Sequence, residues 1–81
     1  MKLVELTEYL VKSIAKQPNM VSVKQFDNEE GKVIIEVLVA EDDMGIVIGR
    51  GGSNANAIRT IVQAASYIDD NKPVRINIDS F

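Results

Sequence analysis

Three glycines within four positions, Gly49, Gly51 and Gly52, constrain the fold of this chain more than any other feature of its sequence. Glycine inside a helix or strand loses the most conformational entropy on folding, so such a cluster indicates a tight turn. The segment that ends at Ile48 and the segment that begins at Ser53 both carry apolar residues at helical spacing. The sequence therefore predicts two helices joined by a short glycine turn.

The rest of the chain divides by hydrophobic periodicity. Leucines and an isoleucine at helical spacing predict an amphipathic helix from Lys2 to about Lys16, which Pro18 ends. The runs 20–26 and 33–39 read as a hairpin, and a polar cluster that closes on glycine separates them. A turn at 69–73 precedes a last alternating strand, 74–79. The predicted order is αββααβ, an α+β fold in which a three-stranded sheet packs against three helices.

The second strand is apolar on both faces, because Ile34 and Leu38 alternate with the valines and isoleucine of the other face. We expect something other than the helices to cover Ile34 and Leu38, such as a partner.

Polar residues next to the predicted helices suggest caps. Glu41, Asp42 and Asp43 are interpreted as an N-cap with favourable charge for the short helix, in preference to a metal site. Ser53 or Asn54 is expected to cap the helix after the glycine turn.

Composition limits the classes of protein that the sequence can encode. The 81 residues suit one domain, 1–81, and the absence of cysteine excludes disulfides and thiolate chemistry and favours an intracellular, cytoplasmic setting. Glu5 and Glu8 interrupt the first apolar run, and no apolar stretch approaches the length of a membrane span, so neither a signal peptide nor membrane insertion is expected. The net charge is −3, yet residues 48–66 contain two arginines and no acidic residue.

The glycine turn itself suggests an anion site. Backbone amides at the start of a helix attract anions, and the missing side chains at Gly51 and Gly52 would let a phosphate approach the main chain while Arg50 reaches over it. The same glycines could instead serve only as a tight helix–helix turn.

The sequence resembles the signature of KH domains in two runs: Gly-Ile-Val-Ile-Gly-Arg-Gly-Gly from Gly45 to Gly52, and then Ala57-Ile58-Arg59. The αββααβ order is that of the type II, bacterial arrangement. The resemblance covers the whole chain, which is similar to the small single-KH proteins of bacteria, the KhpA group.

That resemblance implies an RNA-binding groove in which a GxxG loop clamps the backbone of about four nucleotides of single-stranded RNA. Carried onto this sequence, it implies a clamp with apolar walls and neighbouring polar positions, made up of Gly49, Arg50, Gly51, Gly52, Ile46, Val47, Ile48, Ser53, Asn54, Ile58 and Arg59. The group is also associated with homodimers, with a larger KH-containing partner of the KhpB or Jag type, and with roles as an RNA chaperone in post-transcriptional regulation and cell shape. No cofactor or metal is implied.

Where relatives often carry basic residues after the loop, this chain has Ser53, Asn54 and Asn56, so weak binding with a shallow salt dependence is expected.

Two other functions were weighed. Catalysis is disfavoured because the chain lacks histidine and cysteine, and because the glycine spacing matches neither a P-loop nor a dinucleotide-binding motif. A protein-interaction module that dimerises and binds little RNA is the stronger alternative, since Ile34, Leu38 and the acidic total suit a subunit that works beside another protein.

Overall fold

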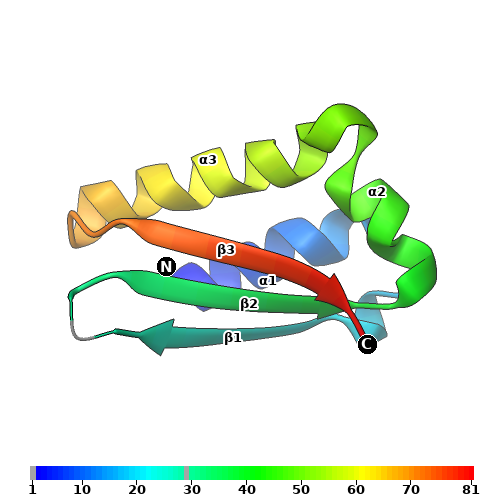
Figure 1. The fold of residues 1–81 in the computed structure, drawn as a ribbon, viewed down its shortest axis with the longest axis horizontal. Helices are drawn as coiled ribbons and strands as arrows, with labels where there is room; N and C mark the ends of the chain where they lie inside the picture. Colours follow the sequence, from blue (N-terminus) through cyan, green and yellow to red (C-terminus); the bar gives the residue numbers. More distant parts are fainter. Residues whose placement is uncertain (1, 29) are drawn as a thin grey trace.

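The computed structural model describes residues 2–28 and 30–81. A three-stranded sheet in the order β1-β2-β3 carries helices on one face (Figure 1). The strands are β1 (Ser22–Asp27), β2 (Val33–Val39) and β3 (Val74–Ser80), and the helices are α1 (Leu3–Ile14), α2 (Met44–Ile48) and α3 (Ser53–Asp69). Short 3-10 turns at Pro18–Met20, Glu41–Asp43 and Arg50–Gly52 connect them. The predicted αββααβ order is confirmed.

Strand pairing places β2 in the centre of the sheet. β1 pairs with it antiparallel, as the predicted hairpin requires, and Val23 lies opposite Val37. β3 pairs with β2 in parallel, with Ile76 opposite Ile35. A parallel pair needs a long crossover. Here α2 and α3 supply it and cover the sheet.

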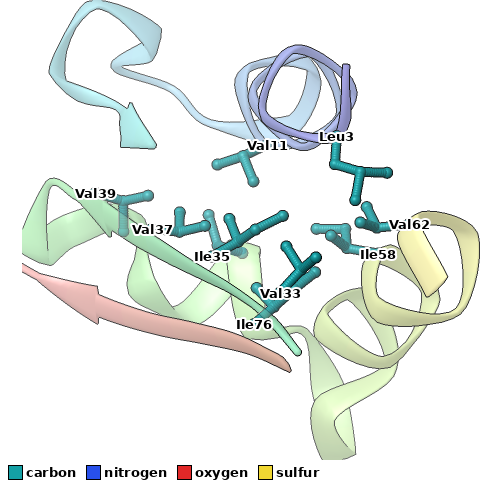
Figure 2. Packing of buried hydrophobic residues seen from close by; sticks show 10 residues of the cluster. Leu3, Val11, Val33, Ile35, Val37, Val39, Ile58, Val62 and Ile76 are labelled. Carbon is teal, nitrogen blue, oxygen red and sulfur yellow. The ribbon is translucent and has the colours of Figure 1, made fainter. Parts of the chain in front are cut away.

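The core lies between the sheet and the helices (Figure 2). The four core-facing residues of β2 are at most 3% exposed, and Val11 of α1 and Val62 of α3 pack on them with no exposed surface. Side-chain burial therefore alternates along β2, because helices cover only one of its two faces. Its core-facing residues are Val33, Ile35, Val37 and Val39.

No helix of the described residues covers the opposite face of the sheet. Ile34 and Leu38 of β2 are half-buried there, and Phe26 and Phe81 are 51% and 63% exposed. Leu38, Phe26 and Phe81 line one shallow depression on this face. The expectation that Ile34 and Leu38 lie outside the helix-covered core is confirmed.

Candidate nucleic-acid interface

Gly49 ends α2 in a conformation that only glycine adopts readily. Its amide donates to the Gly45 carbonyl at 2.9 Å, and its backbone then turns to φ 79° and ψ 169°. A Cβ at this position would lie 2.8 Å from the Asn54 amide nitrogen and 2.9 Å from the Ser53 hydroxyl oxygen. Gly49 is therefore required both by its backbone angles and by the close approach of α3.

Gly51 and Gly52 both have positive φ, 62° and 82°. Apart from its chain neighbours, no atom of the described residues lies within 4 Å of the position that a Cβ on Gly51 would occupy, so its main chain borders open space. Gly52 occupies the N-cap position of α3, where it has no side chain to accept from the helix amides. The loop therefore leaves the positive end of the α3 dipole accessible to an anion.

Arg50 is the cation of the loop itself, and its side chain is exposed. Within residues 2–28 and 30–81 the single ion pair joins Lys12 to Glu8, so no carboxylate of the described chain neutralises Arg50. The guanidinium is thus available beside the accessible backbone of Gly51.

Asp43 occupies the predicted N-cap position of α2 but makes no side-chain bond to its amides, and the N-cap of α3 is Gly52 instead of Ser53 or Asn54. The side chains of Asp43 and Asn54 have longer-range partners. The Asn54 side-chain amide donates to the Ile46 carbonyl at 2.7 Å, so it joins the start of α3 to α2 across the loop. The Asp43 carboxylate is fully buried and accepts from the Lys16 amide at 3.1 Å and the Gln17 amide at 2.9 Å. These bonds fix α2, and hence the loop, against the end of α1.

The apolar residues proposed as groove walls divide by burial. Ile46 is 39% exposed and Ile48 is half-buried, so both offer surface next to the loop. Val47 has no exposed surface and Ile58 is 5% exposed, because both face the core. Val47 therefore has no surface for RNA to contact, and Ile58 can only support the surface from beneath. Ser53 is exposed at the first turn of α3.

Arg59 lies on α3 and turns toward β3. Its Nε and Nη2 each lie 3.4 Å from the Ile76 carbonyl oxygen, and Nη1 lies 3.4 Å from the Asn56 side-chain oxygen. Residues that sequence analysis did not select share this region, since Arg59 lines a shallow groove with Lys32 and Arg75. No local pattern could have brought them together, because they come from α3, the end of the hairpin turn and β3.

Among residues 2–28 and 30–81, no group of three histidine, cysteine, aspartate or glutamate side chains is placed to hold a metal ion. Within the same part of the chain, no helix is both long enough and apolar enough to cross a membrane.

The αββααβ order, the parallel β2–β3 pair and the glycine loop between α2 and α3 together define a KH domain of type II. Solved structures share this fold. Era in complex with MgGDPNP and nucleotides 1506–1542 of 16S ribosomal RNA matches with a TM-score of 0.68 at 17% identity over 96% of this chain and 29% of that chain. Aquifex aeolicus Era bound to GDP and AlF4⁻ matches with a TM-score of 0.70 at 16% identity, and this chain spans only 30% of its length.

Sequence similarity identifies the family of this chain, whereas the solved structures show only its fold. The KhpA/KhpB KH-domain model matches residues 4–78, and the chain belongs to that family. The RNA-binding protein KhpA of Clostridium perfringens is 45% identical over 91% of this chain and 96% of its own length. The RNA-binding protein KhpA of Thermotoga maritima is 36% identical over 91% of this chain and 95% of its own length. The family predicted from the glycine signature is confirmed.

Proposed function

We propose that this chain is an RNA-binding protein whose Gly49-Arg50-Gly51-Gly52 loop clamps the backbone of short single-stranded RNA, without catalytic activity. The open main chain of Gly51 beside the unneutralised Arg50 carries the proposal, because a phosphate can contact amides and guanidinium together. The names of its relatives, RNA-binding protein KhpA, support the choice of ligand.

The surface next to the loop would support the bases. Ile46 and Ile48 present apolar area beside Gly49, and the Asn54 bond to the Ile46 carbonyl keeps the two helices at a fixed angle. Unpaired bases can lie on apolar surface while the loop holds the backbone. Arg50 and Arg59 are the cations on the loop and the first turns of α3, so at most about two phosphates are neutralised, and the affinity is correspondingly modest.

The test is the double substitution Arg50→Asp with Gly51→Asp. Aspartate tolerates the left-handed conformation better than most residues, and the Cβ position at Gly51 meets no atom within 4 Å, so the fold should persist. Two carboxylates in the loop should repel phosphate and abolish binding to an unstructured RNA at low salt.

A matched control is the pair Lys12→Asp with Gly31→Asp. It changes the net charge by the same amount, and Gly31 also has positive φ, 77°, with no atom within 4 Å of its Cβ position. Lys12 is exposed, and its ion pair with Glu8 is of the surface kind that contributes little stability. If the loop variant bound RNA as well as this control, with both folded by circular dichroism, the clamp would be disproved.

We further propose that the protein acts as a homodimer, with a KhpB-type KH protein as a second partner, in RNA regulation in the cytoplasm. Exposed apolar residues in two places support a protein partner. Phe26 and Phe81 are exposed beside the half-buried Leu38 on the open sheet face, and Ile68 of α3 is 83% exposed. Light scattering at tens of micromolar should give twice 8.9 kDa. Leu38→Lys or Ile68→Lys should return the monomer mass and so identify the face, whereas a monomeric parent would refute the dimer.

A further inference from the structure

The outer edge of β3 is covered by side chains of α3 instead of another strand. The Gln63 side chain accepts from the Val74 amide at 2.8 Å and donates to the Lys72 carbonyl at 3.0 Å. One helical turn earlier, Arg59 directs two nitrogens at the Ile76 carbonyl. Residues four apart lie on the same side of a helix, so Arg59 and Gln63 form a continuous polar seam along the strand.

At Ile76 this seam presents more hydrogen-bond donors than acceptors. The amide and carbonyl of one strand residue point to the same edge, so Ile76 presents both toward α3. Its carbonyl is engaged by Arg59, and a guanidinium has five N–H donors and no acceptor. While Arg59 remains at the Ile76 carbonyl, the Ile76 edge therefore offers a ligand mainly hydrogen-bond donors.

The seam borders a groove that is positive and close to the loop. The groove lining includes Lys32, Arg59 and Arg75 and no acidic residue. Arg59 follows Gly52 along α3 by about 10 Å at 1.5 Å per residue, which lies within the span of the roughly four nucleotides that a KH loop holds. A base of an RNA clamped at Gly51 can therefore reach the seam.

We propose that Arg59 selects a base that carries two adjacent hydrogen-bond acceptors, which means guanine through O6 and N7 or cytosine through N3 and O2. This inference rests on the proposed RNA clamp and adds to it a specificity-determining residue. Adenine places its N6 amino donor beside an acceptor on each edge, and that donor would face the guanidinium. Uracil has a donor between its two acceptors, so it lacks the adjacent pair.

The geometry allows Arg59 to turn to a base at small cost. Its contacts with the Ile76 and Asn56 oxygens are all 3.4 Å, at the long end for N–H···O bonds. No carboxylate within the described ranges competes for it. A short movement would let it share its donors between the Ile76 carbonyl and the base.

The test uses seven-nucleotide RNAs that are uridine except for a central A, C, G or U, titrated at fixed low salt. Wild-type protein should bind the C or the G oligomer about fivefold or more tightly than the A oligomer, the low end of what a two-bond base contact supplies. Which of the two binds more tightly identifies the base.

Three variants separate selection from structure. Arg59→Lys keeps the positive charge and loses the planar fork, so affinity for the preferred C or G oligomer should fall to about that for the A oligomer, and the preference over adenine should fall toward one. Arg59→Ala uncovers the Ile76 carbonyl and should improve the A oligomer relative to the C oligomer. Gln63→Ala loosens the same seam and should lower stability while leaving the base preference unchanged.

The outcomes distinguish this inference from the clamp. If wild-type protein bound all four oligomers equally, or if Arg59→Lys kept the preference, selection by Arg59 would be wrong while loop-dependent binding stood. If no oligomer bound at low salt, both would fall together.

Discussion

Replacing Asp43 should cost this domain a large part of its stability. The carboxylate is fully buried and accepts two backbone amides, from Lys16 at 3.1 Å and from Gln17 at 2.9 Å. Hydrogen bonds to a charged group contribute about 1.5–3 kcal/mol each. Lys16 and Gln17 are exposed residues, so water can partly replace the lost acceptor at their amides. We therefore expect Asp43→Ala to cost about 2–3 kcal/mol, at or somewhat below the total of about 3 kcal/mol that two such bonds contribute at the lower end of their range.

That loss is large for a chain of 81 residues, whose free energy of unfolding is expected to be roughly 4–12 kcal/mol. The melting temperature should fall by about 15 °C. Asp43→Asn keeps one acceptor and should lie between wild type and Asp43→Ala. Urea titration followed by circular dichroism should show a lower midpoint with an unchanged slope.

The exposed neighbour Asp42 provides the control, because Asp42→Ala removes the same charge at the same turn without breaking a hydrogen bond of the described chain. It should change stability by less than about 0.5 kcal/mol. If Asp42→Ala and Asp43→Ala were equally destabilising, the charge of the acidic turn and not the two amide bonds would stabilise α2, and the reasoning would be refuted.

Three further expectations concern the loop. Gly49→Ala should destabilise the protein by about 3 kcal/mol or more, because Gly49 has backbone angles that only glycine adopts readily and lies against Asn54. Gly51→Ala should cost only about 1–2 kcal/mol, and chemical denaturation that ranked the two variants in the reverse order would contradict the loop geometry. Gly45→Ala fills open space on an exposed helix position and should raise stability by about 0.5–1 kcal/mol, which a higher melting temperature would show. RNA affinity should fall with salt at a log–log slope no steeper than roughly −1.4, the value for two phosphates. A slope beyond about −3 in a titration from low to physiological salt would require cations that we have not assigned.

The elements of this fold could be predicted from sequence because each depends on a local pattern. The periodicity of leucines predicted α1 within two residues of its observed ends, Leu3 and Ile14, and the alternation of β2 predicted its covered face. The glycine loop was predictable as well, since Gly49 is required by its backbone angles and by its contacts with Ser53 and Asn54, which follow closely in the chain. Parallel pairing of β3 was not predicted from residue patterns, because it depends on the crossover.

The polar contacts of the site could not be predicted, because their partners are remote in sequence. Asp43 and Asn54 both stand where local rules place a helix cap, yet Asp43 accepts from amides 26 and 27 residues away and Asn54 donates to a carbonyl 8 residues away. Sequence analysis named Arg59 because of its charge near the loop. Its contact with the Ile76 carbonyl joins residues 17 positions apart and depends on where the folded sheet places β3. Tertiary packing decides these contacts.

The parallel pairing of β3 also affects the order in which the domain forms. β1 and β2 are joined by a short turn, but β3 can pair with β2 only after α2, the loop and α3 have been traversed. Contacts between distant segments form late because closing a long loop costs entropy, so β3 is expected to dock last and to open first in native-state hydrogen exchange. The groove beside Ile76 exists only while β3 is docked. RNA that occupies this groove should therefore slow hydrogen exchange of the β3 amides, because ligand binding stabilises the docked state of the last strand.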